Sequence, residues 1–161
     1  MIRLKTSVLL AASLKLGGIL AGASDSDLEN LYRFGEKMGL AFQLQDDLLD
    51  VYADEKLFGK KIGGDICCNK KTFLLITAMN LASPEQLAQM KAWMEKEEFD
   101  AQEKVAWFTA MYNELGVKEA CEKRIRELFA KCDAYIDAIS VAEEKKASLK
   151  AFANMILDRN L

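Results

Sequence analysis

One stretch of the chain, Phe42-Gln43-Leu44-Gln45-Asp46-Asp47-Leu48-Leu49-Asp50, predicts a helix that carries a cluster of acidic side chains. Residues three and four apart share a helix face, so Gln43 and the three aspartates are expected on one side, and Leu44 and Leu48 on another. Aspartate is a poor helix-interior residue, and like charges at i and i+4 repel. A hard divalent cation such as Mg²⁺ offsets this repulsion, because it takes carboxylate, water and phosphate oxygens as ligands. The metal ligands predicted from this pattern are Asp46, Asp47 and Asp50.

Two other interpretations of the acidic cluster were weighed. A solvated acidic face is the simplest, but the flanking residues are apolar, which indicates a helix buried over most of its circumference. A buried helix should not carry unpaired carboxylates. A calcium-binding EF-hand fails on spacing: counted from Asp46, the sixth position is Val51 where glycine is needed, and the twelfth is Leu57 where glutamate is needed.

Basic residues follow the acidic cluster directly. The segment 58–66 holds three glycines and two lysines, and Lys70-Lys71-Thr72 comes next. Glycines let backbone N–H groups approach an anion, and lysines act as point charges on phosphate. The P-loop pattern does not occur, and alone such a segment is typical of a solvated turn. Beside an aspartate–Mg²⁺ site, however, the same segment predicts a binding site for a diphosphate. Lys5-Thr6 near the start of the chain adds to this set, although in isolation it would indicate only a basic helix start.

Composition narrows the function classes. The chain has 161 residues, 51% of them hydrophobic and 29% charged, with a net charge of −3, which gives no electrostatic case for binding nucleic acid or an anionic membrane. No apolar run reaches the ~18 residues of a membrane-spanning helix. A secretory signal at residues 8–23 is a weaker alternative, because apolar positions continue helically around Lys15. The four cysteines form no C-x-x-C pair, so we expect reduced thiols and a cytoplasmic protein.

The absence of histidine limits the chemistry that the chain can perform. Ser-His and Cys-His triads, H-E-x-x-H metal sites and imidazole general bases are all excluded. Any reaction must use carboxylates, lysines, amides, hydroxyls or a bound metal.

The apolar pattern has the helical period almost throughout, so we expect an all-α fold, with residues 1–161 forming a single domain. Three capping patterns mark helix starts: Ser26 with Glu29, Ser83 with Gln86, and Asp100 with Glu103. Gly116 marks a helix end. The expected helices cover 4–22, 27–52, 66–81, 84–96, 100–115, 117–139 and 143–158.

Together these motifs resemble those of the trans-prenyl diphosphate synthases, the farnesyl and geranylgeranyl diphosphate synthase family. Lys5-Thr6 resembles the family's K-T segment, and residues 39–50 resemble its second aspartate-rich motif with the preceding F-Q. Residues 59–66 and 69–72 resemble its lysine segment on the pyrophosphate side. The four motifs occur in the family's order, densely in the first half of the chain. The resemblance implies the isoprenoid synthase helical bundle, of which this chain would be the C-terminal part.

The resemblance also implies roles for the acidic residues. Asp46 and Asp50 would hold Mg²⁺ against the diphosphate of an allylic prenyl diphosphate, and Asp47 would support them. The reaction implied is the condensation of that substrate with isopentenyl diphosphate, in isoprenoid biosynthesis.

Further roles follow from the same resemblance for residues near the substrate. Lys5 and Lys60 would contact the allylic diphosphate, and Lys70 would contribute to the same charge balance. Thr6 and Gln43 would lie near the allylic carbon, where oxygen dipoles stabilise the carbocation that forms when diphosphate leaves. The released diphosphate would take the final proton, which suits a chain without histidine.

The chain departs from the family pattern in one large respect. It has no second D-D-x-x-D motif, and it lacks the arginines and the glycine-lysine segment that bind isopentenyl diphosphate in the family. We therefore expect the C-terminal half of a synthase, inactive by itself, whose exposed faces favour a homo-oligomer. Two alternatives stay open: a non-catalytic partner subunit of a complete synthase, and a class I terpene cyclase. The lysine loop and the Lys-Thr segment favour the elongating synthase over the cyclase.

Overall fold

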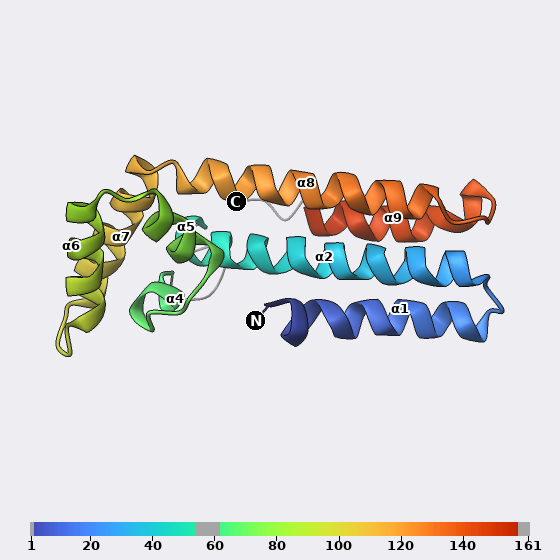
Figure 1. Ribbon diagram of the computed structural model, residues 1–161, viewed down its shortest axis with the longest axis horizontal. Helices are drawn as coiled ribbons and strands as arrows, with labels where there is room; N and C mark the ends of the chain where they lie inside the picture. The colour runs from blue at the N-terminus through green and yellow to red at the C-terminus, as the bar shows by residue number, and fades with distance from the viewer. Residues whose placement is uncertain (1, 54–61, 158–161) are drawn as a thin grey trace. The chain divides into compact units, whose positions relative to one another are not determined.

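The computed structural model describes residues 2–53 and 62–157, and all regular secondary structure in these ranges is helical, which confirms the predicted all-α class. The elements are a π-helical turn η1 (Arg3–Ser7) and the helices α1 (Val8–Leu20), α2 (Asp25–Tyr52), α4 (Gly64–Cys67), α5 (Phe73–Leu81), α6 (Pro84–Glu95), α7 (Ala101–Glu114), α8 (Val117–Asp137) and α9 (Glu143–Leu157) (Figure 1). The chain divides into two compact units, one holding residues up to 43 and from 124 onward, the other residues 44–123.

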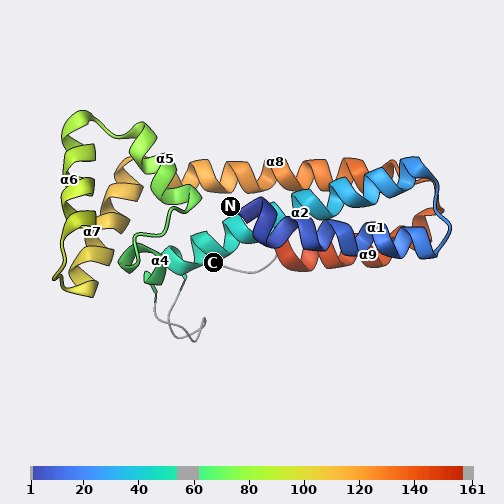
Figure 2. The same cartoon turned by 60° about the horizontal axis from the view of Figure 1, so that its bottom comes forward.

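The first unit is a layered set of helices. In it η1, α1, the first part of α2, the second part of α8, and α9 lie alongside one another (Figures 1 and 2). The apolar faces that they bury supply the core of this unit, which includes Ala11, Phe34, Met38, Ile136 and Ala153. Burying such side chains is the main stabilising contribution to a helical unit of this kind.

Two glycines of α2 let the preceding segment approach closely. A Cβ atom added to Gly35 would lie 2.7 Å from the Cα of Ala11, and one added to Gly39 would lie 2.7 Å from the Cα of Ser7. Both distances are shorter than ordinary carbon–carbon contacts, so no larger residue fits without moving the backbones apart. The glycines therefore fix η1 and α1 against α2.

The second unit holds the end of α2, the helices α4 to α7 and the start of α8. Its buried residues include Leu48, Leu74, Phe108, Tyr112 and Cys121. Gly63, the residue before α4, has a φ of +80°, and a Cβ there would clash with the side chain of Val105. Glycine meets both requirements, because it adopts positive φ without strain and leaves room for α7.

Most predicted helix boundaries are confirmed, and two predictions are wrong. Residues 66–81 do not form one helix: α4 ends at Cys67, and Asn69, with a φ of +50°, turns the chain before α5 begins at Phe73. Thr72 explains the break, since its side chain accepts a hydrogen bond from the backbone N–H of Leu75 and caps α5.

The second wrong prediction is the cap of α2. Helix α2 begins at Asp25, two residues earlier than expected, and Ser24 accepts the hydrogen bond from the backbone N–H of Asp27. The capping box of Ser83 with Gln86 and the cap at Asp100 are present as predicted. All four cysteines are free, as their spacing indicated.

No helix in the described part of the chain combines the length and the apolar character needed to cross a lipid bilayer.

Candidate diphosphate and metal site

The three aspartates of the predicted cluster, Asp46, Asp47 and Asp50, occupy different environments, although they lie close together on α2. Asp47 is only 1% exposed, whereas Asp46 and Asp50 are half-buried. Adjacent residues on a helix point about 100° apart, so Asp47 turns further into the core than its neighbour Asp46. The acidic cluster, predicted to lie on one helix face, is therefore divided into one buried carboxylate and two more accessible ones.

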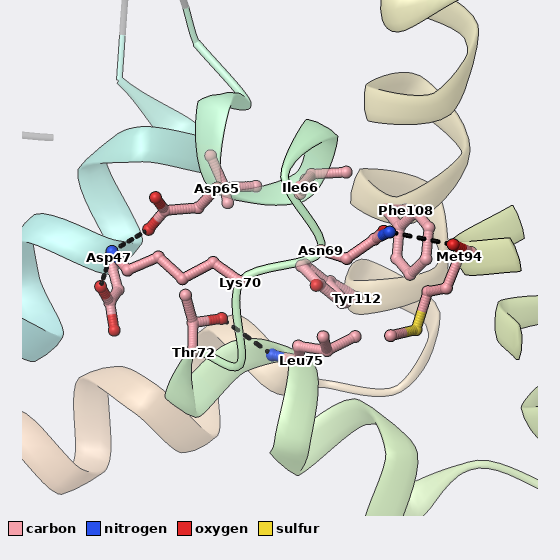
Figure 3. A pocket seen from close by; sticks show the side chains of 11 residues that line it. Asp47, Asp65, Ile66, Asn69, Lys70, Thr72, Leu75, Met94, Phe108 and Tyr112 are labelled. Carbon is pink, nitrogen blue, oxygen red and sulfur yellow. Dashed lines mark hydrogen bonds and ion pairs between the residues drawn. The ribbon is translucent and has the colours of Figure 1, made fainter. Parts of the chain in front are cut away.

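Lys70 connects the buried aspartate to the segment that follows the cluster. Its Nζ atom lies 3.4 Å from Oδ1 of Asp47 and 2.6 Å from Oδ2 of Asp65 (Figure 3). Burial by itself lowers the pKa of Lys70, but the hydrogen bond and charge of Asp65 and the charge of Asp47 outweigh it, so the pKa lies above the ordinary lysine value. Lys70 is therefore a cation that balances two carboxylates.

Asp50 is held by the backbone of the same segment. Its Oδ2 accepts a hydrogen bond of 3.0 Å from the backbone N–H of Asp65. Burial raises the pKa of Asp50, the hydrogen bond from Asp65 opposes this, and the negative charges of Asp65 and Asp46 raise it further. A cation bound at Asp50 would relieve this unfavourable concentration of negative charge.

The residues present fit a magnesium ion that also binds phosphate oxygens. Within residues 2–53 and 62–157, no group of three acidic, cysteine or histidine side chains is arranged to hold a metal ion by itself. Mg²⁺ seldom requires such a group, because it usually keeps several waters and binds one or two carboxylates together with substrate phosphates. Asp46 and Asp50, one turn apart on α2 and both partly accessible, offer two carboxylates of this kind.

In the first unit, the structure brings two other predicted site residues together. Thr6 on η1 donates a hydrogen bond of 3.3 Å from its Oγ1 to Oε1 of Gln43 on α2, while Lys5 is exposed. Glu36, only 3% exposed, pairs with Arg3 at 3.1 Å and so anchors η1 to α2. Hydrogen bonding and the charge of Lys37 keep the pKa of Glu36 below the ordinary glutamate value, with further help from Arg3, although burial opposes this.

Some residues of this region were not predicted, and one prediction lies outside the described residues. Lys60 falls within 54–61 and is not described. Asp65 and Asn69 fall within the motif ranges 59–66 and 69–72 but were assigned no role. Asp65 bonds to Asp50 and Lys70, and Asn69 bonds to the backbone carbonyl of Met94 on α6. Lys104 on α7 was missed altogether, although its spacing from Phe108 and Met111 places it on the buried face of a helix, where a lysine is unusual.

Fold and geometry together describe an all-helical protein in which a cluster of aspartates lies against a lysine from the turn after α4. The sequence profile of the Polyprenyl synthetase family matches residues 1–112, which is more than half of the chain. The chain therefore belongs to the Polyprenyl synthetase family.

Relatives in this family are synthases of isoprenyl diphosphates. The chain is 42% identical over 86 residues to a geranylgeranyl diphosphate synthase of Sulfolobus acidocaldarius, an alignment that covers 53% of this chain and 26% of that protein. It is 43% identical over 79 residues to a short chain isoprenyl diphosphate synthase of Methanocaldococcus jannaschii, covering 49% of this chain and 24% of that protein.

Solved structures of the family superpose on nearly the whole chain. A crystal structure of a geranylgeranyl pyrophosphate synthase matches 99% of this chain with a TM-score of 0.89 and 33% identity, but only 50% of that chain is covered. The Corynebacterium glutamicum geranylgeranyl pyrophosphate synthase, crystallised with isoprenyl diphosphate and magnesium, matches 98% of this chain at a TM-score of 0.85 and 34% identity, covering 45% of its own chain. The chain thus spans about half the length of these solved structures.

Proposed function

We propose that this chain supplies half of the active site of a trans-prenyltransferase of the farnesyl or geranylgeranyl diphosphate synthase type. The observation that carries the proposal is the arrangement on α2, where Asp46 and Asp50 are partly accessible while Asp47 is neutralised by Lys70. This leaves two carboxylates available to a Mg²⁺ ion and its diphosphate. The substrates of the complete enzyme are then an allylic prenyl diphosphate and isopentenyl diphosphate.

The proposed mechanism assigns a separate task to each group of residues. Asp46 and Asp50 would hold Mg²⁺, and the bound ion would supply positive charge to the diphosphate of the allylic substrate. Lys5, exposed on η1, serves as a point charge for a diphosphate, the role that its match to the family's K-T segment implies. When the allylic C–O bond breaks, the oxygen dipoles of Thr6 and Gln43 face the positive carbon. The double bond of isopentenyl diphosphate then forms the new C–C bond, and loss of a proton to the released diphosphate restores neutrality at carbon.

Calorimetry of diphosphate binding tests the metal site without requiring turnover. We expect binding that depends on Mg²⁺ and is weakened at least tenfold by Asp46→Ala or Asp50→Ala, since each removes a metal ligand. Asp133→Ala, which changes an exposed aspartate of α8, serves as the matched control and should bind as the original chain does. Equal binding with and without Mg²⁺ would contradict the proposal.

We also propose that the chain alone does not condense prenyl diphosphates, because it spans about half of the enzymes that it matches. Loss of one well-placed electrostatic contact costs about 10²–10³ in rate, and loss of the second substrate's binding site removes its positioning as well. The assay follows radiolabelled isopentenyl diphosphate with several allylic primers and excess Mg²⁺. Turnover should appear only after a polypeptide corresponding to the other half of a relative is added. Turnover by the purified chain that Asp46→Ala abolishes would show this to be wrong.

The coverage of half a synthase also supports a second candidate, a non-catalytic partner subunit of a complete synthase. This second candidate is favoured if the chain binds a complete synthase and Asp46→Ala leaves its affinity for diphosphate unchanged. In either case we propose a cytoplasmic protein, in keeping with its free cysteines.

A further inference from the structure

Lys104 is buried in a way that calls for a physical explanation. It lies on α7 with an exposed fraction of 0%. Its Nζ donates a hydrogen bond of 2.8 Å to Oδ1 of Asn69 and lies 4.1 Å from the ring centroid of Phe99. Across residues 2–53 and 62–157, no carboxylate forms an ion pair with it, and burial lowers its pKa. A buried ammonium without a carboxylate partner is unfavourable, so Lys104 is an unusual choice for stability alone.

The partner of Lys104 is the residue that turns the chain between α4 and α5. Asn69 has a left-handed backbone with a φ of +50°. Its side-chain oxygen accepts from Lys104, and its Nδ2 donates a hydrogen bond of 2.9 Å to the backbone carbonyl of Met94 (Figure 3). Its backbone N–H donates to the carbonyl of Ile66. One amide side chain thus ties the turn to α6 and α7 together.

This turn sets the position of the groups that face the aspartates. Directly after Asn69, the backbone N–H of Lys70 donates 2.9 Å to the carbonyl of Asp65. The side chain of Lys70 donates hydrogen bonds to Asp47 and Asp65, and the backbone N–H of Asp65 donates one to Asp50. The cavity behind these groups is only about 10 Å³, roughly the room for one water molecule, so the packed turn has little freedom to rearrange.

We propose that Lys104 and Asn69 are positioning residues for the aspartate site: they hold the 65–70 turn so that Lys70 neutralises Asp47 while Asp46 and Asp50 stay available to a Mg²⁺-bound diphosphate. This inference rests on the proposed function. The connection runs from Lys104 to Asn69, which directly precedes Lys70, and from Lys70 to Asp65. A role in positioning also accounts for a buried charge that the fold would be more stable without.

Two variants separate positioning from a structural role. Lys104→Met keeps an unbranched side chain of similar length and removes the charge, so the melting temperature should stay the same or rise. Asn69→Gly removes both amide hydrogen bonds but keeps the positive φ, which glycine adopts without strain. Both variants should weaken Mg²⁺-dependent diphosphate binding about tenfold, as loss of supporting hydrogen bonds around metal ligands commonly does. Lys91→Met, at an exposed lysine of α6 that no motif of the diphosphate site includes, is the control and should change neither quantity.

Hydrogen exchange gives a readout that does not depend on ligand. The backbone amides of Asp65 and Lys70 should exchange faster in both variants than in the original chain and in Lys91→Met. If the original chain does not bind Mg²⁺-diphosphate, the proposed function fails, and the exchange of these two amides alone then decides the present inference. Unchanged exchange and unchanged affinity would overturn it, as would a lower melting temperature of Lys104→Met with affinity retained. If Lys104→Met fails to fold, the results for Asn69→Gly decide whether the inference holds.

Discussion

Asp27 shows how one buried carboxylate joins two chain segments far apart in sequence. Its Oδ1 accepts a hydrogen bond of 2.8 Å from the backbone N–H of Ser140, and its Oδ2 accepts one of 2.5 Å from the hydroxyl of the same residue. These bonds, from the hydroxyl first and then from the backbone, hold the pKa of Asp27 below its ordinary value, although burial opposes them. The ionised form is therefore the one that stabilises the fold.

A pH dependence follows from the lowered pKa. A carboxyl whose pKa is depressed in the folded state contributes stability above its unfolded pKa, and this contribution is lost as the pH falls through the folded value. At pH 7 we expect Asp27→Asn to melt below the original chain. The difference should shrink as the pH falls below about 3.8, the ordinary value. Thermal melts between pH 7 and pH 3 measure this.

The matched control for Asp27→Asn is Asp25→Asn, at an exposed aspartate in the first turn of α2. Its melting temperature should stay close to that of the original chain at every pH. A deficit of Asp27→Asn that persists undiminished at pH 3 would show that the charge of Asp27 is not what stabilises this contact.

At the scale of single residues, a sequence reveals side chains that recur at helical spacing. It does not reveal residues whose role depends on a turn that brings distant parts of the chain into contact. Asp46, Asp47 and Asp50 stand out because three acids share one helix. The burial of Asp47 could not be predicted, because it depends on its ion pair with Lys70, which lies in the turn between α4 and α5. Asn69 and Lys104 are inconspicuous in the sequence because their roles depend on a left-handed turn and on contacts 35 residues apart.

Among the elements, the start of α6 gives the clearest link between local sequence and stability. Ser83 accepts from the backbone N–H of Gln86, and the side chain of Gln86 accepts from the backbone N–H of Ser83. We expect Ser83→Ala to lower the free energy of unfolding by about 1 kcal/mol, the usual contribution of an N-cap. Urea denaturation followed by circular dichroism measures it.

Ser26→Ala is the informative comparison, because Ser26 is the residue that the sequence pattern alone would select as a cap. The structure places Ser26 inside α2, where alanine is the better helix former, so this variant should be neutral or slightly stabilising. Ser24→Ala, by contrast, should be destabilising, because the Ser24 hydroxyl accepts a hydrogen bond from the backbone N–H of Asp27. A loss in Ser26→Ala as large as that in Ser24→Ala would show that α2 begins where the sequence pattern placed it.

The same comparison shows what local patterns can predict about elements. Helix existence and most boundaries follow from apolar period and caps, so α6 and α7 begin where the sequence indicated. The break between α4 and α5 was not predicted because Ile66 and Phe73 are seven residues apart, a spacing that also suits one continuous helix across the polar residues 69–72. Asn69 ends the helical path with its left-handed backbone, and Thr72 caps the start of α5. Neither effect changes the spacing of apolar residues.

At the scale of the molecule, the first unit exposes more apolar surface than a stable monomer usually tolerates. On α1, the exposed fractions are 72% for Leu9, 58% for Leu16 and 82% for Leu20, and on α9 the fraction is 61% for Met155. Large contiguous apolar patches on monomeric proteins mark association surfaces. We therefore expect the chain to self-associate in solution, with these faces covered by a second copy.

Sedimentation velocity over a range of concentrations tests this expectation. The triple variant Leu9→Ser, Leu16→Ser, Leu20→Ser should shift the distribution toward monomer and reduce the binding of an apolar dye. A triple change at exposed alanines of other helices, Ala88→Ser, Ala106→Ser and Ala130→Ser, is the control and should leave the distribution as it was. A dispersed monomer with no dye binding in the original chain would contradict the expectation.

The close approach at Gly35 and Gly39 has a consequence for how the first unit can move. The contacts pair Gly35 with Ala11 and Gly39 with Ser7, so they repeat one helical turn apart on both sides. Sliding α1 along α2 by one turn would bring Gly39 opposite Ala11 but set Gln43 against Ser7, where there is no room for a side chain at backbone distance. Translation along this seam is therefore blocked. The η1 turn with Lys5 and Thr6 is therefore held in a fixed register against the first part of α2.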